Sequence, residues 1–273
     1  MKPVDFDYAR AEDAAQAVTL LAAEEGAKVM SGGQSLGPML NLRLVRPTRL
    51  VDLRNLADLR GVRDAGNAMV YGAATRHVEF EDGLVPDAAQ GMLRHVARGI
   101  AYRAVRNRGT IGGSLAHADP AADWVNTCLA LDATLILLSP DGSRQVKARD
   151  FMLGAFTTTL RDGEIIAAVS IPKLSTQARW GYYKICRKTG EFAEALGAVV
   201  VDPARSYCRV VLGATDGEPA CLDDVADALA SRGAADPFQL RDAVLAALPG
   251  ASPVSLRHHE TALRRAIAQV YPS

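Results

Sequence analysis

Two double-glycine motifs hold the residues of this sequence that are best suited to bind a phosphate group. One spans residues 31–35 and reads Ser-Gly-Gly-Gln-Ser, and the other spans residues 110–114 and reads Thr-Ile-Gly-Gly-Ser. Adjacent glycines let the backbone approach a ligand closely and turn through positive φ, so that successive N–H groups can point at the same phosphate oxygens. A serine beside each pair adds a short hydroxyl donor. This chemistry requires no lysine.

The segments around the two motifs support phosphate binding more than the glycines themselves do. A chain with 23 glycines would contain roughly two adjacent pairs by chance, so the number of pairs is uninformative. After the second motif, Asp119 suits the N-cap and Pro120 the first turn of a helix expected over residues 121–131, and a helix N-terminus favours a nearby anion. A short buried strand expected over residues 27–30 leads into the first motif. Two ordinary turns remain the alternative.

The overall composition argues against several classes of protein. The 273 residues carry 31 basic and 31 acidic side chains, and the arginines are scattered, which argues against nucleic-acid binding. No apolar run approaches the roughly 20 residues of a membrane span, and the N-terminal residues form no apolar leader, so a cytoplasmic location is expected. The cysteines at positions 128, 186, 208 and 221 are far apart and form no Cys-x-x-Cys, which argues against an iron–sulfur or zinc site.

Other reactive-looking residues lack the companions that their chemistry requires. His117, Asp119 and Asp123 lie close together in the sequence, but no second group of metal-binding residues accompanies them. Neither Ser35 nor Ser114 stands in a Gly-x-Ser-x-Gly elbow, which argues against a hydrolase. The Gly-x-Gly-x-x-Gly fingerprint and the Walker pattern are also absent from the sequence. We therefore predict no catalytic residue and no metal ligand, and a dinucleotide would have to be bound by another fold.

The N-terminal segment is expected to form a small βαβ-like unit that presents the first motif. Apolar residues at helical spacing predict a helix over residues 11–25, and strands are predicted over residues 27–30 and 50–53. The pattern then changes to α+β. Hairpins are predicted with strands at residues 59–64 and 69–72 and at residues 133–138 and 144–147, helices over residues 75–80 and 87–98, and a strand over residues 165–171.

The C-terminal segment reads as strands followed by helices. A polar stretch over residues 172–177 is expected to be a linker between domains. Strands are predicted over residues 180–186, 196–201 and 207–212, and helices over residues 222–230, 237–248 and 256–270. This order suits a three-stranded antiparallel sheet with its helices on one face. The predicted fold class is α+β.

The order of these motifs resembles the FAD-binding medium subunit of the molybdenum hydroxylases, the family of carbon monoxide dehydrogenase and xanthine dehydrogenase. Residues 31–36 resemble the first pyrophosphate loop of that family, which usually begins with alanine, so Ser31 is a departure. Residues 108–114, with residues 117–120 and Asp123, resemble its second loop. Residues 156–172 resemble the strand that closes the flavin domain, and residues 182–193 the start of the C-terminal domain. The match runs nearly end to end.

The resemblance implies a PCMH-type FAD-binding fold, similar to that of vanillyl-alcohol oxidase. It implies an FAD-binding domain at residues 1–174, with subdomains at about residues 1–56 and 57–174. A C-terminal domain like that of the carbon monoxide dehydrogenase flavoprotein would occupy residues 178–273.

The resemblance also implies which residues contact a non-covalently bound FAD. Lys184 would lie near the carbonyl oxygens of the flavin ring, where a cation stabilises the anionic reduced form and raises its potential. Tyr182 would stack on the ring, Leu160 would contact it through the backbone, and Asp123 would accept a hydrogen bond from FAD. The predicted cofactor-binding residues are Val29, Met30, Ser31, Gly32, Gly33, Gln34, Ser35, Leu36, Thr110, Ile111, Gly112, Gly113, Ser114, Asp123, Leu160, Tyr182 and Lys184.

In such a complex this chain would receive electrons from 2Fe–2S clusters of a partner and pass them to an external acceptor. The implied partners are a large molybdopterin subunit and a small subunit with two 2Fe–2S clusters, in a dimer of heterotrimers. The substrate pocket would lie on the large subunit, and an acceptor other than NAD is expected because the chain lacks a nicotinamide fingerprint. The alternative is a self-sufficient flavin oxidase or reductase with His77 or His95 as its base. A third possibility is an interaction module without flavin.

Overall fold

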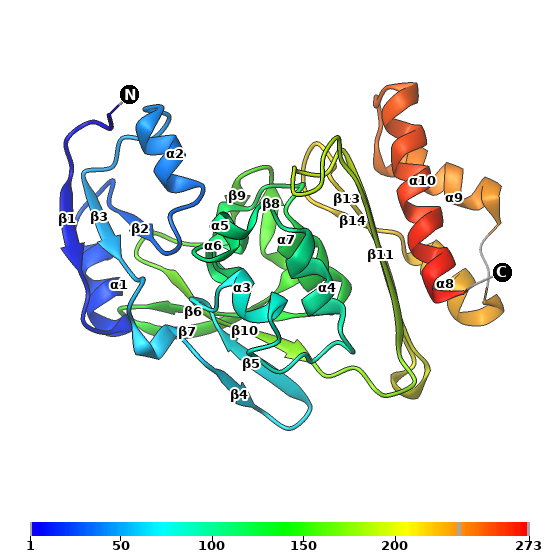
Figure 1. The fold of residues 1–273 in the computed structure, drawn as a ribbon, viewed down its shortest axis with the longest axis horizontal. Coiled ribbons are helices and arrows are strands. Elements are labelled where there is room, and N and C mark those ends of the chain that lie inside the picture. The colour runs from blue at the N-terminus through cyan, green and yellow to red at the C-terminus, as the bar shows by residue number, and fades with distance from the viewer. Residues whose placement is uncertain (1, 234–235, 272–273) are drawn as a thin grey trace.

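The structure is a computed structural model that describes residues 2–233 and 236–271. Its elements form layers along the longest axis of the molecule (Figure 1). A three-stranded sheet at the N-terminal end is followed by a five-stranded sheet, a layer of helices, a four-stranded sheet and a last layer of helices. The predicted α+β class is confirmed.

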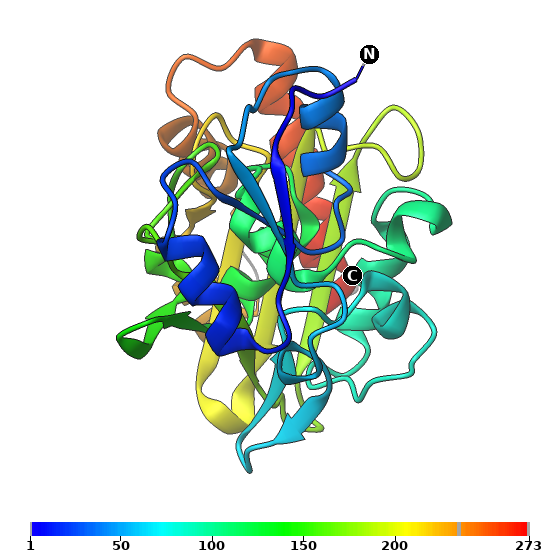
Figure 2. The ribbon, with the colours of Figure 1, turned by 90° about the vertical axis from the view of Figure 1, so that its left-hand side faces the viewer.

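The N-terminal layer is the predicted βαβ-like unit with one additional strand. Its parallel strands lie in the order β1-β3-β2, and the first motif follows the end of β2. Asp13 caps α1 by accepting a hydrogen bond from the Gln16 N–H at 2.7 Å. Figure 2 shows this layer from its outer side, with α1 and α2 beside the sheet. Its elements are β1 (Asp7–Arg10), α1 (Ala14–Ala22), β2 (Lys28–Met30), α2 (Leu36–Asn41) and β3 (Arg49–Asp52).

The central sheet is antiparallel throughout, in the order β4-β5-β10-β6-β7. Both predicted hairpins are present, and the strand predicted over residues 165–171 lies between them as β10. The sheet consists of β4 (Val62–Asp64), β5 (Ala68–Gly72), β6 (Thr134–Ser139), β7 (Gly142–Lys147) and β10 (Ile165–Pro172). Shorter elements of this part are η1 (Ala57–Leu59), η2 (Ala148–Asp150), β8 (Met152–Gly154) and β9 (Thr157–Thr158).

A layer of helices lies between the central sheet and the C-terminal sheet. These helices are α3 (His77–Glu81), α4 (Met92–Gly99), α5 (Arg103–Arg106), α6 (Ile111–His117) and α7 (Asp123–Ala130). Trp124 of α7 and Leu93 of α4 are fully buried in a core that also contains Tyr71 and Leu135 of the central sheet and Ala198 of the C-terminal sheet. One continuous core therefore joins the central layer to the C-terminal layer.

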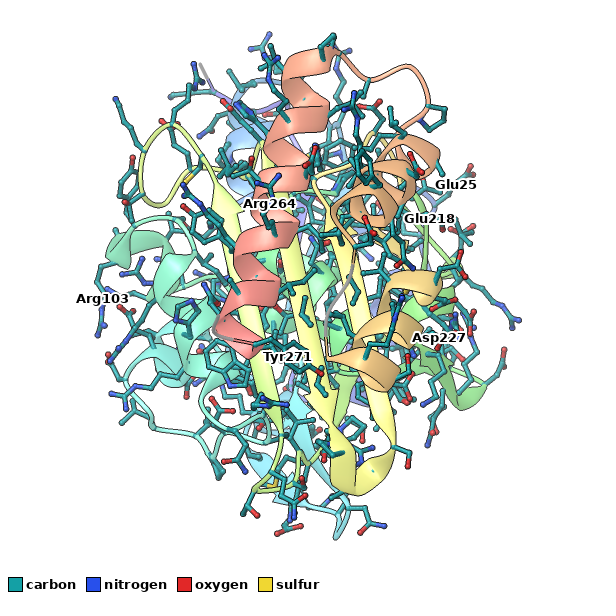
Figure 3. The ribbon with its side chains drawn as sticks, turned by 90° about the vertical axis from the view of Figure 1, so that its right-hand side faces the viewer. Glu25, Arg103, Glu218, Asp227, Arg264 and Tyr271 are labelled. Atoms are coloured by element: carbon teal, nitrogen blue, oxygen red, sulfur yellow. The ribbon has the colours of Figure 1, made fainter. Side chains whose placement is uncertain are left out.

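The C-terminal sheet has both faces covered, which explains why every residue of β12 is buried. Leu196, Ala198 and Val200 pack toward α4 and α7, while Val199 and Val201 pack toward the C-terminal helices. Figure 3 shows α10 lying along the sheet with α8 and α9 beside it. The elements are β11 (Arg179–Ile185), β12 (Ala195–Asp202), η3 (Pro203–Arg205), β13 (Tyr207–Gly213), β14 (Ala220–Cys221), α8 (Asp223–Arg232), α9 (Pro237–Ala247) and α10 (Pro253–Val270).

Several sequence-based expectations about individual elements are wrong. The C-terminal sheet has a fourth strand, β14. Its own helices α8, α9 and α10 pack on one face, as predicted, and the other face is covered by α4 and α7. The strand β2 is not buried, because Lys28 is exposed and its other residues are partly exposed. The helix predicted over residues 87–98 starts at Met92, since the Asp87 carboxylate binds the Ala89 N–H at 2.8 Å and forms a turn there.

The largest difference concerns the second motif. Its glycines lie in the first turn of α6, where no helix was predicted because glycine disfavours helical backbone. The Thr110 hydroxyl caps α6 by accepting a hydrogen bond from the Gly113 N–H at 3.1 Å. The helix expected from residue 121 starts at Asp123, with Ala122 at the N-cap. Asp119 instead accepts a hydrogen bond from the Ala121 N–H at 2.9 Å, within the preceding turn.

Candidate functional site

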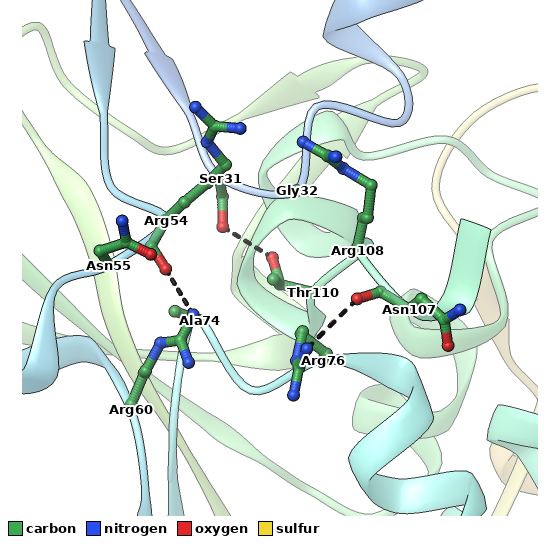
Figure 4. Close-up of a pocket in the computed structure, with 10 residues that line it drawn as sticks. All are labelled: Ser31, Gly32, Arg54, Asn55, Arg60, Ala74, Arg76, Asn107, Arg108 and Thr110. Carbon is green, nitrogen blue, oxygen red and sulfur yellow. Dashed lines mark hydrogen bonds between the residues drawn. The ribbon is translucent and has the colours of Figure 1, made fainter. Parts of the chain in front are cut away.

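The two glycine motifs meet in the structure, although they lie far apart in the sequence. The hydroxyl groups of Ser31 and Thr110 are 2.9 Å apart and 79 residues apart in the chain. Gly32 is necessary for this approach, because a Cβ at this position would overlap the backbone of Arg108 and Gly109. Figure 4 shows the hydrogen bond between the hydroxyls at the centre of the contact. The two predicted phosphate-binding motifs therefore lie side by side.

The first motif is an open loop with unused hydrogen-bond donors. The N–H groups of Gly32, Gly33, Gln34 and Ser35 donate to no oxygen of residues 2–233 and 236–271. Gly33 has a φ of +69°, a left-handed conformation that L side chains adopt only with strain. A row of free N–H groups at a turn with positive φ forms a concave donor surface for an anion. This loop has the properties that the sequence predicts.

The second motif has its N–H groups occupied. Gly112 and Ile111 donate to the carbonyl oxygens of Ala73 and Thr75 at 2.9 and 3.0 Å. Gly113 donates to the Thr110 hydroxyl at 3.1 Å, and the Ser114 N–H donates to the Thr110 carbonyl at 3.0 Å. The expectation that both motifs present free N–H groups is therefore wrong for the second motif. What this motif offers to a ligand is the hydroxyl groups of Thr110 and Ser114.

The glycines of the second motif serve close packing instead. A Cβ on Gly112 would lie 2.8 Å from the Ala73 carbonyl oxygen, so only glycine lets α6 approach the segment that follows β5. A Cβ on Gly109 would lie 2.7 Å from Nε2 of His77. The second motif is thus a rigid support against which the first motif is placed.

A polar cavity of about 170 Å³ adjoins the contact between the motifs (Figure 4). We call it the arginine cavity, because four of its lining residues are arginines. They come from the turn after β3, from the end of η1, from the N-cap of α3 and from the segment before α6. The cavity is lined by Ser31, Gly32, Arg54, Asn55, Arg60, Ala74, Arg76, Asn107, Arg108 and Thr110.

A second polar group, formed by Asp123, Tyr182 and Lys184, connects α7 to β11. The Tyr182 hydroxyl donates to Oδ1 of Asp123 at 2.6 Å, and Nζ of Lys184 lies 3.0 and 3.1 Å from the two carboxylate oxygens. Lys184 also donates to the Gly99 carbonyl at 2.8 Å. All three side chains are at least nine-tenths buried. Alternation along β11 places Tyr182 and Lys184 on the same face of the sheet.

Each charge of this group lies at a helix end that stabilises it. Asp123 is the first residue of α7, where the helix dipole favours a negative charge, and Lys184 lies against the C-terminal carbonyl of α4, where it favours a positive charge. Burial, and then the charge of Asp123, raise the pKa of Tyr182 well above its usual value, so this hydroxyl remains a donor. The three predicted cofactor contacts are thus preassembled as a hydrogen-bonded ion pair.

The remaining predicted residues lie around these two centres. Val29 and Met30 are in β2, and Leu36 is the first residue of α2. The Gln34 side chain donates to the Gly32 carbonyl at 3.2 Å, within the first motif. Leu160 packs against the central core, and its N–H donates to the Thr158 hydroxyl at 3.2 Å.

The turn that carries Leu160 is fixed by an ion pair. Arg144 of β7 contacts both carboxylate oxygens of Glu164 at 2.7 Å and donates to the Thr159 carbonyl at 2.7 Å. Hydrogen bonds from Arg144 lower the pKa of Glu164, so this carboxylate stays charged. The backbone around Leu160 therefore has a defined position.

The two histidines considered as a base, His77 and His95, and the third candidate residue, His117, are packed against aromatic side chains. His77 is buried and accepts a hydrogen bond from Trp124 Nε1 at 2.9 Å, and burial together with the charge of Arg106 lowers its pKa to about 3. His95 lies between the rings of Trp180 and Tyr182, and burial lowers its pKa as well. His117 packs beside Phe156, with the centroids of the two rings 5.1 Å apart. These contacts favour structural roles.

Within residues 2–233 and 236–271, no three side chains of His, Cys, Asp or Glu come together in a group that could hold a metal ion. In the same part of the chain, no helix combines the length and hydrophobicity needed to cross a membrane.

The arginines of the cavity are the site residues that sequence reasoning missed. Arg54, Arg60 and Arg76 lie in three separate connecting segments and share no spacing that would connect them. Arg108 is the exception, because it lies two residues before Thr110. Its position next to a glycine motif was the one available signal.

Comparisons with known proteins identify the family of this chain. The family model described as the FAD binding domain in molybdopterin dehydrogenase matches residues 4–174. The carbon monoxide dehydrogenase medium chain from Hydrogenophaga pseudoflava is 37% identical over 216 residues, covering 78% of this chain and 75% of that protein. The glyceraldehyde dehydrogenase medium chain from Sulfolobus acidocaldarius is 37% identical over 201 residues, covering 74% of this chain and 71% of that protein.

Solved structures extend the similarity to nearly the whole chain. Carbon monoxide dehydrogenase from Hydrogenophaga pseudoflava, in a form that lacks the Mo-pyranopterin moiety, has a TM-score of 0.91 at 30% identity and covers 99% of both chains. Quinoline 2-oxidoreductase from Pseudomonas putida 86 has a TM-score of 0.88 at 31% identity and covers 99% of this chain and 98% of its own. The chain therefore belongs to the molybdenum hydroxylase family, as a medium, FAD-binding subunit.

Proposed function

We propose that this chain is the electron-transfer flavoprotein subunit of a molybdenum-dependent dehydrogenase complex. It holds FAD non-covalently, receives electrons from 2Fe–2S clusters of a partner subunit and passes them to an external acceptor. One observation carries the proposal. In a chain of the FAD-binding family, two glycine motifs meet beside a row of N–H groups that have no acceptor among the described residues.

The residues present fit the two chemically different parts of FAD. The free N–H groups of residues 32–35 and the hydroxyls of Thr110 and Ser114 supply donors for the diphosphate. Asp123, Tyr182 and Lys184 supply a buried polar group for the flavin part, and Leu160 supplies a fixed backbone. When bound, the flavin ring supplies the redox chemistry, while the protein contributes binding, orientation and electrostatics. We propose that the cofactor contacts predicted from the sequence, from Val29 to Lys184, act in these roles.

Lys184 would act on the flavin together with Asp123 rather than as an isolated cation. Because its ammonium group already contacts both oxygens of the Asp123 carboxylate, part of its field is neutralised. The pair therefore orients a positive end without placing a full net charge in a buried site. This weakens the predicted increase in flavin potential but makes the position of Lys184 well defined.

We further propose the quaternary and cellular setting. A large molybdopterin subunit and a small 2Fe–2S subunit accompany this chain in a dimer of heterotrimers located in the cytoplasm. The medium chains and medium subunit among its relatives support this arrangement. We also propose an FAD-binding domain over residues 1–174, with subdomains that meet near residue 56, and a C-terminal domain over residues 178–273. The family match to residues 4–174 supports the first of these limits.

The self-sufficient oxidase is not favoured. It requires a base beside the flavin, and both candidates are committed elsewhere. His77 is held neutral by burial and hydrogen-bonded to Trp124, and His95 is packed between aromatic rings. A flavinless interaction module is also inconsistent with the family.

The test is purification of the complete chain, alone and from its native host. Alone, it should take up added FAD and show a flavin absorption spectrum, but oxidise no organic substrate. From the host, it should co-purify with two further subunits that carry molybdenum and iron. A folded chain that takes up no FAD would contradict the proposal, and so would substrate-driven bleaching of the flavin by the isolated chain.

A further inference from the structure

The walls of the arginine cavity carry a large excess of positive charge. Four guanidinium groups line it, and none of its lining residues is acidic. Positive charge concentrated in a small polar cavity attracts an anion, because the walls screen it less than bulk water would. The question is which of these charges is available to a ligand.

Two of the four arginines are neutralised by carboxylates. Arg54 contacts both oxygens of the buried Asp52 carboxylate at 3.0 Å or less, and although burial acts to raise it, the pKa of Asp52 is lowered by hydrogen bonds from Arg54 and Tyr8. Arg76 pairs with Glu79 at 3.1 Å. Both guanidinium groups are therefore engaged by the protein itself.

The other two arginines, Arg60 and Arg108, have no carboxylate partner among the residues that the structure describes. One nitrogen of Arg60 donates to the Arg54 carbonyl at 2.5 Å, which fixes this side chain without compensating its charge. The side chain of Arg108 makes neither a hydrogen bond nor an ion pair with any residue in the described parts of the chain. The Arg108 backbone packs against Gly32, so the Arg108 side chain extends from the contact between the two motifs. Arg108 is the uncommitted cation of the cavity.

The hydroxyl pair beside Arg108 also has a donor to spare. Ser31 and Thr110 share one hydrogen bond, and the Thr110 oxygen already accepts from the Gly113 N–H. Two hydroxyls carry two hydrogens, and their mutual contact uses one of them. The other can be donated to an oxygen in the cavity, which Gly32, with its free N–H group, also lines.

We infer that the arginine cavity receives a phosphate of the FAD diphosphate and that Arg108 is the principal charge partner of this phosphate. The inference rests on the proposed FAD-binding function. A guanidinium presents a planar fork of donors that matches phosphate oxygens, so it combines charge with orientation. The diphosphate is then bound by backbone N–H groups on one side and by an arginine on the other, instead of by N–H groups alone.

The test measures FAD affinity of the complete chain, stripped of flavin, for Arg108→Gln and Arg108→Lys. Loss of a charged hydrogen bond should weaken FAD binding by roughly tenfold to a hundredfold in Arg108→Gln. The salt dependence of binding should also decrease, because one exposed charge no longer contributes. Arg108→Lys keeps the charge but loses the planar fork of donors, so its affinity for FAD should lie between that of the wild type and that of Arg108→Gln. Quenching of flavin fluorescence during a titration measures the FAD affinity of the wild type and of both variants.

Arg149→Gln is the matched control. Arg149 is an exposed arginine in η2 that does not line the cavity and has no ion-pair partner among the described residues. Its substitution should leave FAD affinity unchanged, and thermal melting should show that every variant is folded. Wild-type affinity in Arg108→Gln would overturn the inference, and so would equal weakening in Arg108→Gln and Arg108→Lys. Failure of the wild-type chain to bind FAD would instead contradict the proposed function, so the two failures are distinguishable.

Discussion

The two glycine motifs look alike in the sequence but have different structural roles. The first is a loop with a left-handed glycine and free N–H groups. The second is the first turn of a capped helix, and its N–H groups bind Ala73, Thr75 and Thr110. In the first motif glycine provides backbone freedom for a ligand, whereas in the second it provides room for neighbouring protein. A pair of glycines therefore does not by itself identify the half of a site that contacts the ligand.

The difference has a consequence for how the site is built. A loop with free N–H groups has no fixed conformation of its own, and it needs a support that does not move. The second motif provides this support, because α6 is packed against Ala73 and linked to the first motif through Thr110. Substitutions in the two motifs should therefore separate binding from stability.

The largest effect is expected for Gly112→Val. The new side chain would overlap the Ala73 backbone, which cannot move away without disturbing the segment after β5. We expect the free energy of unfolding to fall by about 3 kcal/mol or more, with FAD binding lost as a result of unfolding. Chemical denaturation measures it. Gly37→Ala is the control, since nothing lies within 4 Å of that position in α2. Equal stability of both variants would show that the second motif is not a packed support.

The next effect concerns pH and the histidine under the second motif. Burial lowers the pKa of His77 to about 3 from 6.5, so the unfolded chain takes up a proton on this residue below pH 6.5 that the folded chain does not. Stability should therefore fall as the pH falls, by up to about 2 kcal/mol at pH 5. His77→Gln should lose this part of the decrease. Urea denaturation at pH 7 and pH 5 measures it, and an unchanged pH dependence in the variant would count against a neutral His77.

Gly33→Ala should weaken FAD binding directly and lower stability only a little, whereas Gly112→Val acts mainly on stability. The position has space for a methyl group, with the Met30 sulfur 3.5 Å away, but its φ of +69° is strained for alanine. We expect stability to fall by about 1 kcal/mol and FAD affinity to fall about tenfold, because the N–H groups shift. Gly66→Ala is the control, since it has a φ of +78° in the open turn between β4 and β5. It should lose similar stability and keep its FAD affinity. If both variants bind FAD equally well, the N–H groups of the first motif do not bind the FAD diphosphate.

The smallest effect is expected at the hydroxyl contact between the motifs. Thr110→Val removes the cap of α6 and should cost about 1 kcal/mol of stability, while Ser31→Ala removes only the contact and should cost less. A double-mutant cycle on denaturation should give a coupling of about 0.5–1 kcal/mol. Additive effects would mean that the two motifs are not energetically linked through these hydroxyls.

Much of the fold was predictable because its signals are local. Short strand runs joined by turn residues predicted both hairpins, a further apolar run predicted β10, and the helical runs predicted α8, α9 and α10 close to their observed limits. The elements that were missed or displaced have two kinds of cause, a local turn at a helix start and packing against a distant segment. The start of α7 is set by the turn at Asp119, and α6 contains glycines that only the packing against Ala73 explains.

The candidate site divides in the same way. That residues 31–35 and 110–114 belong together was predicted from their order, and their contact through Ser31 and Thr110 agrees with it. Free N–H groups were predicted for both motifs from their glycines, and only the first motif has them among the described residues. The occupied N–H groups of the second were not predictable, because their acceptors belong to the segment after β5.

The sequence by itself determined the family, the α+β class and the presence of two glycine motifs, because residue types and local backbone preferences are written in neighbouring positions. Only the tertiary structure decided which motif keeps its N–H groups free, which arginines converge on one cavity, and that Asp123 neutralises Lys184. These properties depend on partners that are distant in the chain, as in the hydroxyl contact across 79 residues. A hydrogen bond or ion pair between residues distant in the chain forms only when the fold brings them within a few ångströms, so no local pattern can specify it.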